Sequence, residues 1–211
     1  RRLGLHIFRN VIHYLGNLGW FVGVTLISLA DVSALAFTVP LFTVCMAALI
    51  LHETIGPHRW IATLVGFFGM LVIVRPGYIP IEFGTAAVLS SAIFYAISLI
   101  TVRTLSFTEP LNRVLFYMAV VFVPISAGPA MMVWVTPGWA DLWPIVFLGV
   151  TGWFSHFCII RAFSAADASF VPPFDFVRLP VAAGFGWLLY EEVSDIWTWA
   201  GAVVIFAATY Y

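Results

Sequence analysis

Four side chains near the start of the chain can hydrogen-bond or stack, namely Arg9, His13, Asn17 and Trp20. Successive spacings of four, four and three residues place them on one stripe of an α-helix. The stripe presents a cation, an imidazole, an amide and an indole to one partner surface. For His13 and Asn17 it predicts either the wall of a cavity for a polar solute or hydrogen bonds between helices. For Arg9 we expect the long side chain to reach water at the helix end.

A second candidate is an acid and a base three residues apart, Asp175 and Arg178. This spacing allows the two side chains to meet on one helix face and neutralise each other. Pro172, Pro173 and Pro180 surround them and predict a kinked helix with exposed carbonyl groups. The pattern is compatible with a structural ion pair and with part of a binding site.

Further polar residues recur at helical spacing in two other apolar stretches. Ser91, Tyr95 and Ser98 share one face, and His156 follows Thr151 and Ser155. Small hydroxyl residues are typical of helix packing, whereas Tyr95 can stack on a planar solute. The sequence therefore predicts a substrate-binding set of seven residues: His13, Asn17, Trp20, Tyr95, His156, Asp175 and Arg178.

Composition determines the environment of these residues. The chain has 211 residues, of which 63% are hydrophobic and 9% charged, against about 45–50% and about 25% in soluble domains. This excludes a soluble enzyme and indicates a membrane protein. The net charge is −1 and lysine is absent, so there is neither a basic excess for nucleic acid nor a phosphate-binding GxxxxGK motif. The five histidines share no metal-ligand spacing, and we expect no metal, no cofactor and no catalytic residues.

A membrane-spanning helix needs about 20 mostly apolar residues. Short polar segments or Pro/Gly clusters separate eight such stretches, which predict an all-α bundle of about eight spans: 9–29, 33–51, 59–74, 83–101, 114–134, 142–160, 169–189 and 196–210.

The arginines in the loops predict the orientation of these spans. Six arginines fall on the side of the N-terminal end and one, Arg75, on the other. Because arginine-rich short loops stay in the cytoplasm, we expect the N-terminal end there, in an inner (plasma) membrane. Arg59 and Arg103 should face the cytoplasm, and Asp141 and Glu192 the outside.

The sequence contains an internal repeat. ADVS at 30–33 recurs as ADAS at 166–169, and the Glu53–Trp60 spacing recurs as Glu192–Trp199. The repeated spans lie five crossings apart, and an odd displacement inverts the second copy. Inverted repeats are typical of secondary transporters, whose substrate sites lie between the repeats. We interpret Glu53 and Glu192, at matching span ends, as water-facing structural caps and not as proton carriers.

Together these segments resemble the EamA family of the drug/metabolite transporter superfamily. The motifs that carry the resemblance are LADVSALAFTVPLF at 29–42, HET at 52–54 with Gly66 and Gly69, VPPF at 171–174, and YEEVSD at 190–195 with Gly201. The resemblance implies ten helices in two halves, of which this chain matches helices three to ten. It assigns 1–75, with three spans, to the end of the first repeat and 82–211, with five spans, to the second. About two helices would then precede Arg1.

The sequence thus predicts a secondary transporter that moves a small polar or aromatic metabolite by alternating access. Its expected partners are a small-molecule substrate and the lipid bilayer, with a homodimer left open. Two alternatives remain at this point. One is a membrane-embedded enzyme that acts on lipid, because intramembrane His and Asp also serve catalysis. The other is a membrane scaffold that transports nothing.

Overall fold

The computed structural model describes residues 2–27, 32, 35–74, 82–178, 180–181, 184, 188 and 196–210. Within these residues the regular structure is helical. The elements, in chain order, are α1 (Leu3–Leu26), α3 (Val39–Ile50), α4 (Pro57–Val74), α5 (Phe83–Ser106), α6 (Leu111–Met132), α7 (Trp139–Ala165), the 3₁₀ helix η1 (Pro172–Val177) and α9 (Ile196–Tyr210). The chain therefore has the predicted all-α architecture.

Seven of the eight predicted spans coincide with these α-helices in the described part of the chain. The seventh, 169–189, begins as η1, and most of its second half lies outside the described residues. Consecutive prolines at 172 and 173 favour this start, because each lacks a backbone N–H for helical hydrogen bonding. By length and composition, α5, α6 and α7 are each long and apolar enough to cross a membrane.

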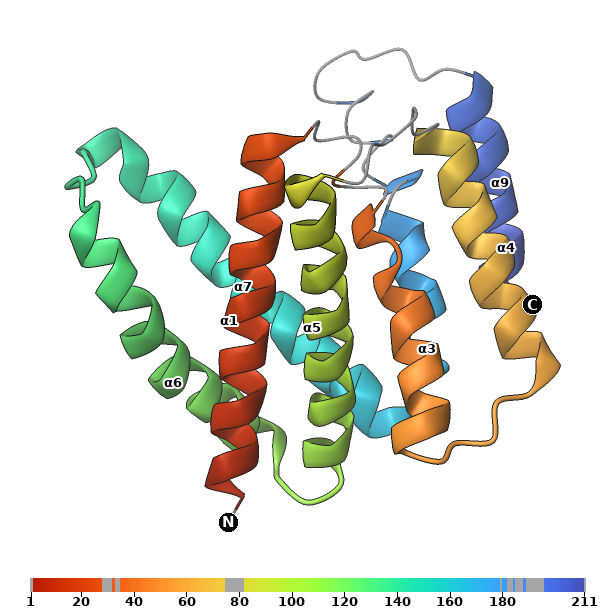
Figure 1. Ribbon diagram of the computed structural model, residues 1–211, viewed down its shortest axis with the longest axis horizontal. Helices are drawn as coiled ribbons and strands as arrows, with labels where there is room; N and C mark the ends of the chain where they lie inside the picture. Colours follow the sequence, from red (N-terminus) through yellow and green to blue (C-terminus); the bar gives the residue numbers. More distant parts are fainter. Residues whose placement is uncertain are drawn as a thin grey trace.

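The helices form a layered bundle with one hairpin that leans away from it (Figure 1). Helix α1 packs along α5, α3 packs on the other side of α5, and α4 pairs with α9 at the far edge. Helices α6 and α7 form the leaning hairpin, and α7 crosses behind α5. The N-terminus, the α3–α4 loop and the α5–α6 loop lie together at the lower end of Figure 1.

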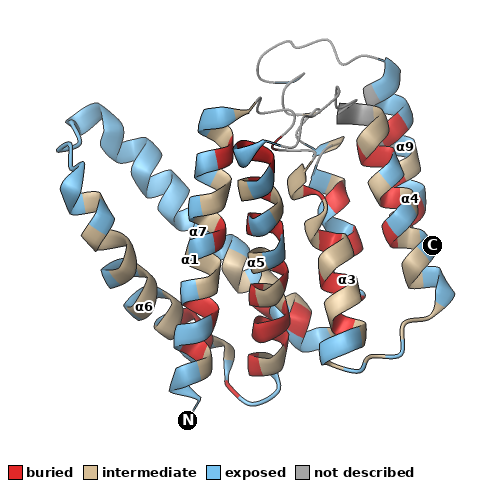
Figure 2. Ribbon diagram, viewed as in Figure 1, coloured by how far each residue is buried: buried red, intermediate tan, exposed pale blue. Residues whose placement is uncertain are grey.

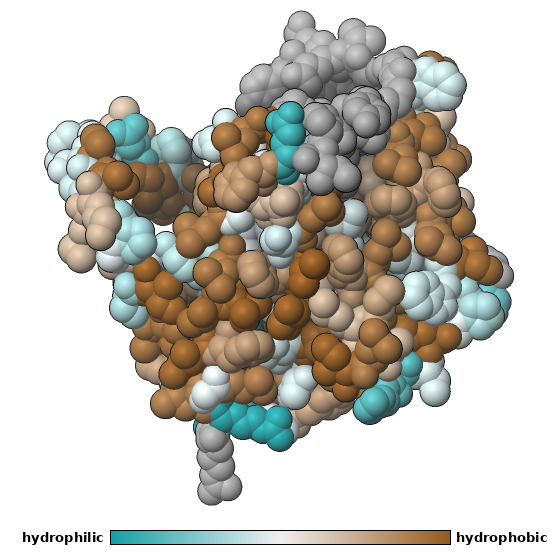
Figure 3. Space-filling view, in the orientation of Figure 1, coloured by the Kyte–Doolittle hydropathy of each residue, from teal (hydrophilic) through white to brown (hydrophobic). Residues whose placement is uncertain are grey.

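Buried residues concentrate where α5 meets its neighbours, as Figure 2 shows, whereas the tip of the α6–α7 hairpin is exposed. One apolar core joins α3, α5, α6 and α7 around Ala47, Leu105 and Phe163. A second joins α4, η1 and α9 around Met70, Phe176 and Ile205. The face of the molecule in Figure 3 is also mostly apolar over the helices, as expected for a protein whose solvent is lipid.

Candidate functional site

The α1–α5 contact is unusually close because glycines face α5. A Cβ added at Gly19 would lie 2.8 Å from the backbone oxygen of Ala87, and one at Gly23 would lie 2.1 Å from Val88 Cγ2. Small residues at a helix interface let two backbones approach each other. This approach brings the polar stripe of α1 within hydrogen-bonding distance of α5.

Two side-chain pairs connect α1 to α5. The Tyr95 hydroxyl donates a hydrogen bond to Asn17 Oδ1 at 2.6 Å. The Ser98 hydroxyl lies 3.3 Å from His13 Nδ1. Buried Ser91 also donates to the backbone oxygen of Gly16, at 2.7 Å. The predicted stripe on α1 and the predicted face on α5 therefore meet.

The lower part of the stripe turns toward α6 and α7. Arg9 Nη1 donates to Asn10 Oδ1 at 2.8 Å, and Arg9 Nη2 lies 3.5 Å from His156 Nδ1. Asn10 in turn donates to the backbone oxygens of His6 and Tyr117. Arg9 is only 3% exposed. The expectation that Arg9 reaches water was therefore wrong, because α6 and α7 cover the side of α1 on which it lies.

Aromatic rings surround His13 in this interior. The ring centroid of His13 lies 5.2 Å from that of Tyr95, 5.4 Å from that of His156 and 5.9 Å from that of Phe122. We call the whole group the α1 polar cluster; it consists of His6, Arg9, Asn10, His13, Asn17, Ser91, Tyr95, Ser98 and His156. It combines a cation, amide and hydroxyl groups and flat rings, which suit a polar solute with an aromatic part.

The structure thus brings together four of the seven predicted binding residues: His13, Asn17, Tyr95 and His156. Trp20 lies further along the same helix, where its ring contacts that of Phe21. Sequence reasoning missed His6 and Asn10 as members of the cluster. Asn10 could have been predicted, because it lies four residues after His6 within an apolar stretch and both residues are polar.

Asp175 and Arg178 lie elsewhere, at η1, which packs against α3, α4 and α9. Arg178 Nη2 is 3.7 Å from Asp175 Oδ2, so the predicted pairing is confirmed. The two side chains are 44% and 61% exposed, however, and Arg178 also stacks on Phe37 at 4.8 Å. Neither hydrogen-bonds to the α1 polar cluster. Whether they contact substrate stays a prediction.

A second group of charges joins helix ends at the lower side of the bundle. Arg103 donates to the Phe163 backbone oxygen at 2.6 Å and pairs with Asp167 at 3.2 Å and with Glu53 at 3.8 Å. Arg59 donates to Asp167 and to the Ser169 hydroxyl. We call these five residues the ionic cluster: Glu53, Arg59, Arg103, Asp167 and Ser169.

Glu53 holds the repeated ADAS segment in place. Its carboxylate accepts hydrogen bonds from the backbone N–H groups of Ala168 and Ser169 and from the Ser169 hydroxyl. Glu53 therefore caps this segment as predicted. The expectation that it faces water was wrong, because its side chain is only 15% exposed, and its exclusion as a proton carrier stays a prediction. Its repeat partner Glu192 lies outside the described residues.

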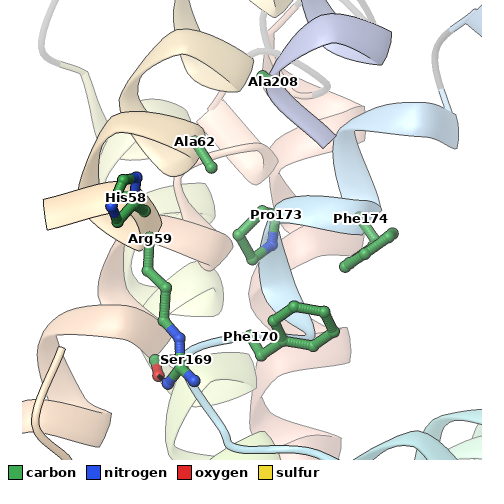
Figure 4. Close-up of a pocket in the computed structure, with 8 residues that line it drawn as sticks. All are labelled: His58, Arg59, Ala62, Ser169, Phe170, Pro173, Phe174 and Ala208. Carbon is green, nitrogen blue, oxygen red and sulfur yellow. Dashed lines mark hydrogen bonds between the residues drawn. The ribbon is translucent and has the colours of Figure 1, made fainter. Parts of the chain in front are cut away.

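A small pocket of about 70 Å³ opens beside the ionic cluster (Figure 4). Arg59 and His58 contribute nitrogen atoms at one side, and Phe170, Pro173 and Phe174 form an apolar side. Arg59 already binds Asp167 and Ser169. The pocket is too small for a metabolite of nucleotide size.

Glu109, in the loop between α5 and α6, marks the same end of the molecule. A hydrogen bond from Arg113 lowers the pKa of the Glu109 carboxyl to about 2 from its ordinary value of 4.5. Arg113 is half exposed. The Glu109 side chain is only 2% exposed, so the pair joins a buried carboxylate to a half-exposed cation.

Long apolar helices with polar side chains enclosed between them define a multi-pass membrane protein. The EamA-like transporter family model matches residues 3–75. The S-adenosylmethionine uptake transporter of Rickettsia prowazekii is 31% identical over 98% of this chain and 70% of its own length. The chain belongs to the EamA-like transporter family, and the expected resemblance is confirmed.

Other relatives at the same level of sequence identity are named for different transported solutes. A riboflavin transporter of Rhizobium johnstonii is 30% identical over 98% of this chain and 68% of its own length. A pseudopaline exporter of Pseudomonas aeruginosa is 30% identical over 96% and 72%. One solved crystal structure shares the fold, with a TM-score of 0.81 and 13% identity over 98% of this chain and 85% of that one. These relatives support a small-metabolite transporter over a lipid-acting enzyme or a scaffold.

Proposed function

We propose that the α1 polar cluster binds the transported metabolite, a small polar or aromatic solute that crosses the inner membrane by alternating access. The observation that carries the proposal is the convergence of His13, Tyr95 and His156, from three different helices, inside a protein that exposes many large apolar side chains. Polar side chains within membrane spans usually mark a solute pathway. The relatives that carry S-adenosylmethionine and riboflavin both transport solutes with planar rings and polar groups.

In this proposal the two repeats, 1–75 and 82–211, move against each other around the site. The α1 polar cluster suits this motion because α1 belongs to the first repeat and α5 and α7 belong to the second. The end that holds the N-terminus and the ionic cluster faces the cytoplasm, in accord with the arginine asymmetry of the loops. The same reading makes the chain a carrier and not an enzyme. A homodimer stays a prediction.

The test measures uptake into proteoliposomes of radiolabelled S-adenosylmethionine and riboflavin. Tyr95→Phe removes the hydrogen bond to Asn17, and His13→Leu removes the central imidazole. We expect each to lower uptake of a transported probe about fivefold to tenfold, the range of one or two lost hydrogen bonds. Thr25→Val is the matched control, because Thr25 is exposed on the same helix and bonds only to its own turn.

Unchanged uptake in both Tyr95→Phe and His13→Leu would contradict the proposed site. Asp175→Asn, measured in parallel, decides whether the η1 pair contributes. A loss of uptake confined to Asp175→Asn would move the binding site from the α1 polar cluster to η1.

A further inference from the structure

We propose that Arg9 binds a carboxylate group of the transported metabolite. This inference rests on the proposed function, and it adds the chemical class of the substrate. Its starting point is a buried cation whose charge the described part of the chain does not neutralise.

The contacts of Arg9 leave much of its hydrogen-bonding capacity unused. A guanidinium has five N–H donors. Among the described residues, Arg9 contacts the Asn10 side-chain oxygen and His156 Nδ1. Its Nε is buried and has no hydrogen-bond partner in the part of the chain that the structure describes. A buried donor without a partner is costly in a lipid-surrounded interior.

Neither neighbour supplies negative charge. The Asn10 amide is neutral, and His156 Nδ1 accepts a hydrogen bond only when the imidazole is uncharged. The described acidic residues that form ion pairs do so with other arginines: Glu53 and Asp167 with Arg103, Glu109 with Arg113, and Asp175 with Arg178. The described residues around Arg9 therefore leave its positive charge unbalanced.

A carboxylate matches this environment in charge and in shape. Its single negative charge balances one guanidinium, whereas a doubly charged phosphate would leave an unpaired charge inside the protein. Its two oxygens also fit the parallel N–H groups of arginine. The rings of His13, Tyr95 and Phe122 lie next along the cluster and can hold an apolar or aromatic remainder.

Burial of Arg9 fits a transport cycle. The residue is 3% exposed and lies between α1 and the α6–α7 hairpin. That hairpin leans away from the bundle, and Figure 3 shows a gap between its tip and the rest of the molecule. A small displacement of α7 from α1 separates His156 from Arg9 and gives the carboxylate its place.

The experiment compares pairs of probes that differ only in the carboxylate. Binding and uptake are measured for S-adenosylmethionine against its decarboxylated form, and for tryptophan against tryptamine, with riboflavin as a probe that has no carboxylate. Wild type should prefer the carboxylate member of a pair by about tenfold to hundredfold, the range of one charge-assisted pair. Arg9→Gln should abolish that preference, and Arg9→Lys should retain part of it because the charge remains.

Arg161→Gln is the matched control, because Arg161 is an exposed arginine on α7, the helix that carries His156. Elution in detergent and the melting temperature show that each variant is folded. A wild type that carries riboflavin or the amine probes but no carboxylate overturns the inference and leaves the proposed function standing. A preference that survives in Arg9→Gln also overturns it. A wild type that binds and carries no probe overturns the proposed function and this inference together.

Discussion

Two buried arginines of this protein have opposite surroundings. Arg103, in the ionic cluster, meets two carboxylates, a backbone oxygen and the ring of Phe107. Arg9, in the α1 polar cluster, meets an amide and an imidazole. Both have a buried Nε that forms no hydrogen bond with any described residue. The partners of Arg103 belong to the chain, so this arginine serves the fold. Arg9 has no acidic partner among the described residues, which fits its proposed role of binding a substrate carboxylate.

The largest effect is expected at the paired arginine. Arg103→Met leaves Glu53 and Asp167 without their shared cation, and breaking a buried pair costs about 3 kcal/mol or more. Thermal unfolding in detergent should show a clear drop in melting temperature. Arg161→Met, an exposed arginine near the end of α7, should change the melting temperature little.

The double variant Arg103→Met with Glu53→Gln then measures the coupling. It should be more stable than the sum of the two single losses implies, because the second change removes a carboxylate that the first left unpaired. Strict additivity of the two single losses would count against the ionic cluster as a unit.

A smaller loss is expected where glycine holds α1 against α5. Gly19→Ala places a methyl group against the backbone oxygen of Ala87, which cannot turn aside. Overpacking of this kind costs about 1 kcal/mol or more. Uptake should fall with it, because the Asn17–Tyr95 hydrogen bond depends on the same approach. Gly4→Ala is the control on the same helix, since nothing lies within 4 Å of its added Cβ. Equal melting temperatures for the two variants would contradict the close contact.

For Arg9 we expect the opposite effect on stability from that at Arg103. Arg9→Met removes a buried charge that no described carboxylate balances and puts a shorter, unbranched apolar side chain in its place. Stability should therefore stay the same or rise by about 1 kcal/mol, while uptake of carboxylate probes is lost. A drop in melting temperature as large as that of Arg103→Met would show that the two arginines do the same structural work.

The smallest effect is expected at the Glu109–Arg113 pair, in which the arginine is half exposed. Because Arg113 lowers the pKa of Glu109, the ionised carboxyl stabilises the folded protein above its ordinary pKa of 4.5. This contribution is lost as the pH falls from about 4.5 toward about 2. Melting temperatures recorded across this range should depend less on pH in Arg113→Gln than in wild type. The same pH dependence in both would contradict the pairing.

The sequence predicted which residues share a face better than how deeply they are buried. Helical spacing correctly grouped His13 with Asn17, and Asp175 with Arg178, because periodicity follows directly from helix geometry. Helical spacing did not predict that Arg9 is buried, because its burial depends on how α6 and α7 pack against α1. The exposed position of the Asp175–Arg178 pair depends on η1, which replaces a regular helix where two prolines meet.

The ionic cluster was beyond sequence reasoning for a different reason. Its members lie far apart in the chain: Glu53 contacts Ser169 across 116 residues, and Arg103 contacts Asp167 across 64. The repeated motifs did contain Glu53, Asp167 and Ser169, so the repeat identified the residues. What it lacked was the packing of α4, α5 and the segment after α7 at one end of the bundle, which only the three-dimensional fold supplies.

The glycine contact between α1 and α5 also has a consequence for how the protein is made. Synthesis proceeds from the N-terminus, and α3 and α4 emerge between the two partners. Until α5 follows, α1 has neither its close neighbour nor hydrogen-bond partners for His13 and Asn17. A charged residue alone in lipid costs about 2.5–3.5 kcal/mol on insertion scales, so Arg9 disfavours release of α1 into the bilayer by itself. Helix α1 is thus expected to stay beside the insertion machinery until its later partners arrive, so that entry into the membrane and assembly of the site become one event.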